Sequence, residues 1–239
     1  MIKGLLWKEW RENQWKLFFC GSVSLALTAL LFRIRLFPDA VNCTVISVVQ
    51  MFAIPVVYAL DIFSGEMSNR TIHLLFKFPV PRWKMFFAKY LVCILSVSLI
   101  FLATGILMES LTQGREIEMG YLILISLLFG IPSLLLFTWF CAFAAQSRSE
   151  AGSLSVIIGL LIGWGIVIFW AIICQVQWAI CFVPYSFCAN FFGYGANNWH
   201  LSTLSTNSQF NQWILSQIII APLVLTIACY RFVKIRRVL

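Results

Sequence analysis

The chain alternates between long apolar runs and short polar connections. Six of the runs have about the 20 residues that a helix needs to cross the roughly 30 Å hydrocarbon core of a bilayer. They cover residues 15–32, 43–63, 85–108, 121–145, 154–175 and 213–232. A transmembrane β-barrel would instead show segments of about 10 residues with alternating polarity. The pattern therefore predicts an all-α polytopic membrane protein, a single transmembrane domain with six spanning helices.

Composition and charge fit this prediction and give the chain an orientation. Hydrophobic residues make up 61% of the 239 positions and charged residues only 11%, far from the composition of soluble domains. Basic residues near span ends favour the cytoplasmic side. With both termini inside, 14 of the 17 Lys and Arg residues are cytoplasmic, and three, Arg33, Arg35 and Arg115, are not. We therefore expect cytoplasmic termini and attraction to anionic lipid headgroups, and no nucleic-acid partner.

The N-terminal segment, residues 1–14, combines apolar residues with charges. Its apolar positions follow helical spacing, while its charged positions point elsewhere: Ile2, Leu5, Leu6 and Trp10 against Lys8, Arg11 and Glu12. Tryptophan prefers the headgroup region, so the segment predicts an interfacial amphipathic helix whose marked residues are Trp7, Glu9 and Trp10. An unstructured basic tail is the alternative.

Residues 64–89 form the longest charged interruption of the apolar pattern. Polar positions recur there at intervals of four, three and four, on one helical face: Glu66, Arg70, His73 and Lys77. The opposite face is apolar, and Pro79 and Pro81 end the pattern. This predicts a cytoplasmic amphipathic helix of about three turns. From the residues alone, it serves equally well as an interfacial connection or as a docking element for a cytoplasmic partner.

The inventory of reactive groups excludes the usual intramembrane enzymes. There is no HExxH motif for a metalloprotease, and no Lys follows a Gly as a phosphate-binding loop requires. Asp39 and Asp61 fall on opposite membrane sides, as do His73 and His200, so neither a carboxylate dyad nor a histidine metal site is expected. We therefore assign no catalytic residue, metal or cofactor to this chain.

Polar residues within or beside the spans are candidates for lining a transport path. These are Gln50, Asp61, Gln175 and Gln217; a hydrated helix end explains Asp61 equally well. The outer connection, residues 176–212, is rich in aromatic residues and almost uncharged, which predicts a re-entrant or interfacial piece rather than a free loop. Whether Cys181 and Cys188 pair in this connection stays open.

Two segments carry a family resemblance. One comprises Glu66, Arg70, Thr71, Leu74, Leu75, Pro79, Pro81, Arg82 and Lys89; the other comprises Leu5, Leu6, Trp7, Lys8, Glu9 and Trp10. Both resemble the permease subunits of type-2 ATP-binding-cassette (ABC) exporters, as does the six-span layout with a long outer connection. Asn69 departs from the glycine that the family often has before the threonine.

The resemblance implies a permease in the cytoplasmic membrane of a prokaryote, with no nucleotide site of its own. Two copies or two related chains would pair, and each would dock a separate cytoplasmic ATPase that holds ATP and Mg. Residues 64–84 would then be the coupling segment. Arg148 and Glu150, in the loop of residues 146–153, would add a smaller contact, and the outer connection would form a gate.

Other interpretations remain at this point. A stand-alone channel or secondary carrier, a nonenzymatic assembly or regulatory subunit, and an intramembrane enzyme are the alternatives. The substrate, and the choice between homodimer and heterodimer, do not follow from the sequence.

Overall fold

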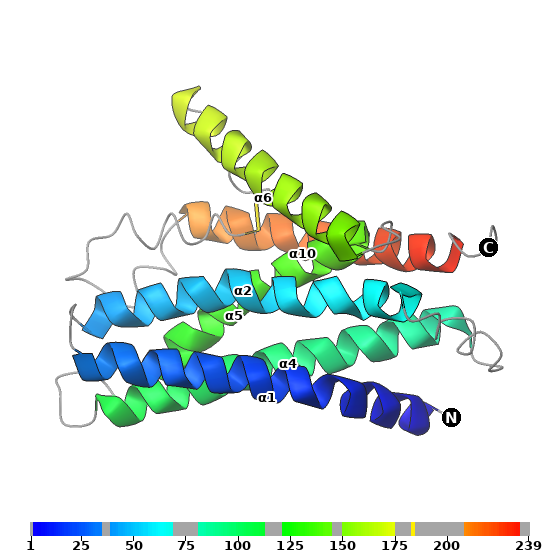
Figure 1. Cartoon of the computed structure of the whole chain (residues 1–239). Coiled ribbons are helices and arrows are strands. Elements are labelled where there is room, and N and C mark those ends of the chain that lie inside the picture. Colours follow the sequence, from blue (N-terminus) through cyan, green and yellow to red (C-terminus); the bar gives the residue numbers. More distant parts are fainter. Residues whose placement is uncertain are drawn as a thin grey trace. The chain divides into compact units, whose positions relative to one another are not determined.

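The computed structural model describes residues 2–34, 39–68, 81–112, 121–144, 150–174, 183–184 and 208–234. These residues form six long helices and no β-strand (Figure 1). In chain order they are α1 (Ile2–Ile34), α2 (Asp39–Ser68), α4 (Arg82–Leu111), α5 (Tyr121–Ala144), α6 (Glu150–Ile173) and α10 (Ser208–Lys234). Each helix contains a stretch long and apolar enough to cross a membrane. The prediction of an all-α membrane protein with six spanning helices is confirmed.

Three helices have 30 residues or more, which is longer than a membrane span requires. At 1.5 Å per residue, the 33 residues of α1 correspond to about 50 Å, and the 30 residues of α2 and of α4 to about 45 Å each. A hydrocarbon core of roughly 30 Å cannot cover such lengths without tilt, so these helices extend into the interfacial region or cross the bilayer obliquely. The N-terminal segment and the first predicted span are therefore parts of one unbroken helix. Similarly, α2 continues through residues 64–68, where we expected the coupling segment to begin.

The chain divides into two units. The first contains Met1–Tyr58 and Phe78–Leu134, and the second contains Ala59–Lys77 and Leu135–Leu239. Accordingly, α1, α4, most of α2 and the first part of α5 belong to the first unit, whereas α6, α10 and the ends of α2 and α5 belong to the second. Within the first unit, α1 packs along α4 (Figure 1).

The polarity of α1 is reversed relative to a helix of a soluble protein. Apart from Phe32, its buried side carries small or polar side chains, namely Glu9, Asn13, Cys20, Ser24 and Thr28. Its exposed side carries large apolar ones, namely Trp7, Trp15, Phe18, Phe19, Val23 and Leu30. Small and polar residues favour close helix packing inside a bilayer, where lipid solvates the apolar face. The exposed face of α1 is therefore suited to contact with lipid.

A close crossing joins α4 to α5 within the first unit. A Cβ atom added to Gly105 would lie 2.9 Å from Ile123 Cα and 3.0 Å from Ser126 Cβ. The hydroxyl of Ser126 donates a hydrogen bond of 2.6 Å to the backbone carbonyl of Phe101. The absence of a side chain at Gly105 thus lets the two backbones approach closely enough for a hydrogen bond between the helices.

In the described part of the second unit, aromatic packing joins α5 to α6, and a hydrogen bond joins the outer connection to α10. The indole of Trp164 on α6 lies edge-to-face against Trp139 of α5, with ring centroids 5.5 Å apart. Trp213 near the start of α10 donates its indole N–H to the carbonyl of Val183 at 3.2 Å. Val183 belongs to the outer connection, so this bond ties part of that connection to α10. Apart from Val183 and Pro184, the residues of the connection up to 207, with Cys181 and Cys188 among them, lie outside the described residues.

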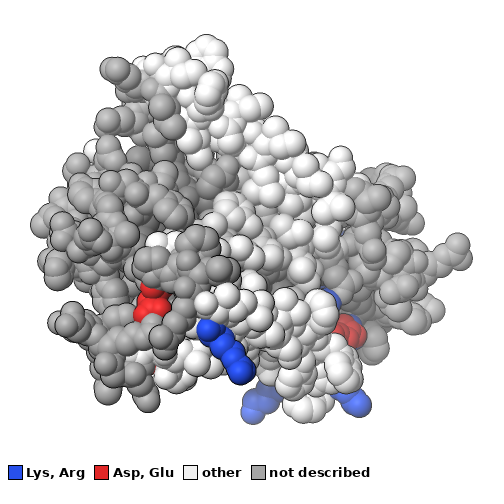
Figure 2. All heavy atoms as spheres, turned by 60° about the vertical axis from the view of Figure 1, so that its left-hand side comes forward, with Lys and Arg blue, Asp and Glu red and all other residues white. Residues whose placement is uncertain are grey.

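On the face of the molecule drawn in Figure 2, charged side chains are sparse and most of the described atoms are white. On α6, large apolar side chains such as Phe169, Trp170 and Ile173 are exposed. An exposed surface of this kind is costly in water and favourable in hydrocarbon. It therefore agrees with the membrane location inferred from composition.

Candidate functional site

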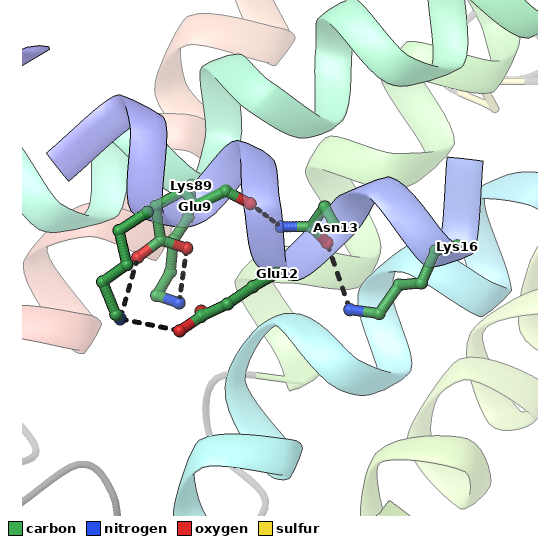
Figure 3. A network of polar contacts seen from close by, with 6 residues as sticks. Glu9, Glu12, Asn13, Lys16 and Lys89 are labelled. Carbon is green, nitrogen blue, oxygen red and sulfur yellow. Dashed lines mark hydrogen bonds and ion pairs between the residues drawn. The ribbon is translucent and has the colours of Figure 1, made fainter. Parts of the chain in front are cut away.

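A buried ion pair connects α1 to α4. Lys89 Nζ lies 2.9 Å from Glu9 Oε2, although the two residues are 80 positions apart in the sequence (Figure 3). Glu9 is 1% exposed and Lys89 is 5% exposed. An isolated charge at such a position would be strongly disfavoured, because it loses its hydration without gaining a partner. The pair makes both charges tolerable and links the two helices at one point.

Further polar groups continue this network along α1. Lys8 Nζ lies 3.6 Å from Glu9 Oε1 and 3.2 Å from Glu12 Oε1. The side chains of Lys8 and Glu12 are 40% and 50% exposed, so the network reaches the surface through them. On the next turn, Asn13 donates its amide to the Glu9 backbone carbonyl at 2.9 Å and accepts from Lys16 at 3.1 Å. The result is a polar strip that runs from a buried pair to water.

The beginning of α4 lies close to this pair along the chain. Pro81 precedes the helix, and its carbonyl accepts hydrogen bonds from the backbone N–H groups of Lys84 at 2.9 Å and Met85 at 3.4 Å. Proline has no N–H of its own, so it fits a position ahead of the first helical hydrogen bonds. The ammonium of Lys84 lies 5.4 Å from the centre of the Trp83 ring, a cation–π distance. This cluster of basic and aromatic residues suits an interface between membrane and water.

A second polar contact lies deeper in the first unit, between α2 and α4. Gln50 is 2% exposed and donates its amide to Thr104 Oγ1 at 3.1 Å. Thr104 in turn donates to the carbonyl of Ile100 at 2.8 Å. Gln50 Oε1 has no hydrogen-bond partner among the described residues. The Gln50 side chain therefore joins α2 to α4 through its amide N–H, and its Oε1 atom is able to accept a hydrogen bond from a further donor.

The structure places the other candidate path residues only in part. Gln217 is buried on α10, in the second unit. Asp61 lies within α2, but its side chain is outside the described part, and Gln175 lies outside the described residues altogether. A path formed by these four residues stays a prediction.

The proposed ATPase-coupling residues lie mostly beyond the described residues. Glu66 falls in the last turns of α2 and Glu150 begins α6, but neither side chain is among those described. Arg70, His73, Lys77 and Arg148 are not described at all. Of the residues marked on the N-terminal segment, Trp7 is exposed, Trp10 is partly buried and Glu9 is buried.

The pairing of Glu9 with Lys89 was not predicted from the sequence. In the sequence, Glu9 stands on an amphipathic segment and Lys89 among the residues that carry the family resemblance, and the two were not predicted to meet. One sequence feature pointed to the pair: both charges interrupt apolar helical patterns on the same predicted side of the membrane. Charges in such positions usually pair with one another. The partnership between Gln50 and Thr104 was missed as well, since threonine alone carries no distinctive sequence signal.

The comparison with protein families agrees with this architecture. A family model described as "ABC-2 family transporter protein" matches residues 15–235, which include all or part of every one of the six helices. Among curated proteins, no sequence matches the chain. Since the family match covers most of the 239 residues, the chain belongs to the ABC-2 family and is a multi-pass membrane permease of an ABC transporter.

Proposed function

We propose that this permease is the membrane-spanning subunit of an exporter in the cytoplasmic membrane of a prokaryote, with both termini cytoplasmic. It pairs with a second copy or a related chain, and each permease docks a separate cytoplasmic ATPase that binds ATP and Mg. The observation that carries the proposal is the ABC-2 family match over residues 15–235. The distribution of Lys and Arg supports the orientation, since 14 of 17 then lie inside.

Docking is assigned to the polar face of the coupling segment, residues 64–84. Glu66, Arg70, His73 and Lys77 share one face by their spacing, and Arg148 and Glu150 of the next cytoplasmic loop add a smaller contact. A charged helix face of this kind fits a groove with a complementary rim on a soluble partner. The continuation of α2 to Ser68 supports direct transmission, because the start of this segment is part of a spanning helix.

The transported molecule is proposed to be lipid-like or amphipathic. The buried charged side chains that the structure describes are Glu9 and Lys89, and they neutralise each other. A carrier driven by protons or ions would instead need titratable groups at the middle of the membrane. Gln50, with its open acceptor, is the best-described candidate for contact with a polar group of the substrate.

Co-purification and ATP hydrolysis test the proposal. The tagged permease, extracted from its native membrane, should bring down an ABC ATPase whose hydrolysis of Mg-ATP vanadate inhibits. Glu66→Lys or Arg70→Glu should reduce the amount of ATPase recovered at least severalfold, while Glu12→Lys, a reversal on exposed α1 surface, should not. Failure to recover an ATPase with the unaltered permease would refute the proposal. Full recovery with both reversals would refute only the docking assignment.

A further inference from the structure

The Glu9–Lys89 pair lies where the first turns of α1 meet the beginning of α4. Lys89 follows Arg82, the first residue of α4, by seven positions. This is two helical turns, or about 10 Å along the axis. The proposed coupling segment leads directly into this end of α4. In the proposed function, the movement of that segment is passed along the chain to α4 within two turns of the ion pair.

An ion pair fixes the relative position of two helices more narrowly than apolar packing does. Sliding α1 along α4 by one turn, about 5.4 Å, would break the 2.9 Å contact between the buried charges of Glu9 and Lys89. By contrast, the hydroxyl of Thr28 on the buried side of α1 is satisfied within its own helix by the carbonyl of Ser24, at 2.8 Å. Apolar side chains of similar volume would hold the helices together with no desolvation cost. The charged pair therefore fixes the position of α1 along α4, rather than making the two helices bind each other more strongly.

We infer that Glu9 and Lys89 are positioning residues that make the first turns of α1 move together with the beginning of α4 when a bound ATPase displaces it. This inference rests on the proposed function. The ion pair transmits the movement because its 2.9 Å contact couples two long helices, each rigid through its own backbone hydrogen bonds. Without the pair, α4 still responds to the ATPase, but α1 no longer follows in a fixed register.

The test reports the two helices separately. A fluorescent unnatural amino acid is placed at position 11 of α1 or at position 83 of α4, where Arg11 and Trp83 are both exposed. The permease and its co-purified ATPase are reconstituted in lipid vesicles, and emission is compared between the nucleotide-free and the vanadate-trapped state with Mg-ATP. In the parent protein, both probes should change their emission.

The decisive variant is the double replacement Glu9→Met and Lys89→Met, which removes both charges and leaves no unpaired one. We expect the position-83 probe to respond as in the parent and the position-11 probe to lose its response. The charge swap Glu9→Lys with Lys89→Glu keeps an ion pair with the charges exchanged and should restore that response. If the original residues were needed only for the structure, the swap would not restore it. The matched control, Glu12→Gln, removes a half-exposed charge that is paired with Lys8 rather than with Glu9, and it should leave both responses intact.

Two results would overturn the inference. One is a position-11 response in the double Met variant equal to that of the parent, and the other is a position-11 probe that does not respond in the parent while position 83 does. Failure of the proposed function gives a different result, since no ATPase would co-purify and neither probe would respond to vanadate trapping.

Discussion

At the scale of single residues, the charges of Glu9 and Lys89 are acceptable only together. Each side chain is at least 94% buried, so removing one partner takes away the 2.9 Å ionic contact of the other in a poorly solvating environment. Breaking a buried pair in this way typically costs about 3–5 kcal/mol, whereas replacing both partners by apolar residues of similar volume is often close to neutral. The changes in unfolding free energy caused by the two single replacements should therefore be strongly non-additive.

We predict that Glu9→Met and Lys89→Met each lower the free energy of unfolding by about 3–5 kcal/mol, and that the double variant stays within about 2 kcal/mol of the parent. The measurement is thermal or denaturant unfolding of the detergent-solubilised permease, analysed as a double-mutant cycle. The exposed pair Lys8 and Glu12 is the control, with an expected coupling below about 1 kcal/mol. Additive losses in the Glu9–Lys89 cycle would contradict the prediction.

Replacing Gln50 can show whether this residue contributes to the stability of the permease or to transport. Hydrogen bonds between membrane helices average about 0.6 kcal/mol, and replacing Gln50 by Leu also removes its unpaired buried acceptor. We therefore expect Gln50→Leu to change unfolding stability by less than about 1 kcal/mol, but to alter substrate-dependent stimulation of the ATPase. Thr104→Val, which removes only the partner hydroxyl, is the control and should leave stimulation closer to the parent. Equal stimulation by the parent and Gln50→Leu would exclude Gln50 from the transport path.

At the scale of helices, the contact between α4 and α5 depends on a missing side chain. A methyl group at Gly105 would meet backbone at 2.9 Å, and backbone cannot move aside as a flexible side chain can. Overpacking of this kind typically costs about 1–3 kcal/mol. Gly105→Ala is therefore expected to destabilise the permease by that amount in thermal unfolding and to weaken the Ser126–Phe101 hydrogen bond.

Gly130→Ala provides the matched control on the same pair of helices. Its added methyl group would meet the ring of Phe101 at 3.5 Å, an ordinary contact distance. Replacing a helical glycine by alanine reduces the entropy lost on folding, so this variant should be neutral or more stable by about 0.5–1 kcal/mol. If both variants behave alike, close backbone approach is not what Gly105 provides.

The sequence predicted the spanning helices well because a bilayer imposes a single, strong requirement on them. Some 20 apolar residues in succession leave few alternatives, and the predicted spans fall within or close to the observed helices. Element ends were less predictable. The N-terminal segment was expected as a separate helix, yet α1 runs unbroken from Ile2, because its polar positions Glu9 and Asn13 suit helix packing as well as they suit a water-facing surface.

Side-chain partnerships were the least predictable feature. Glu9 finds its partner in another helix, 80 residues away, and no local pattern encodes that distance. Hydropathy also cannot distinguish the lipid-facing side of α1 from its packed side, since lipid and protein are both acceptable surroundings for apolar groups. Its small residues Ser24 and Thr28 carry that information, and their meaning becomes clear only once α4 is known to lie alongside.

At the scale of the whole molecule, orientation decides whether the coupling segment can meet a cytoplasmic ATPase at all. The distribution of basic residues predicts that Glu12 lies inside and Arg115 outside. In a variant without native cysteines, a membrane-impermeant maleimide should label Arg115→Cys in intact cells, and Glu12→Cys only after the membrane is opened. Glu12 is half exposed, so access to the reagent depends on its side of the membrane rather than on burial. The reverse labelling pattern would place the coupling segment outside the cell and remove the physical basis for ATPase docking.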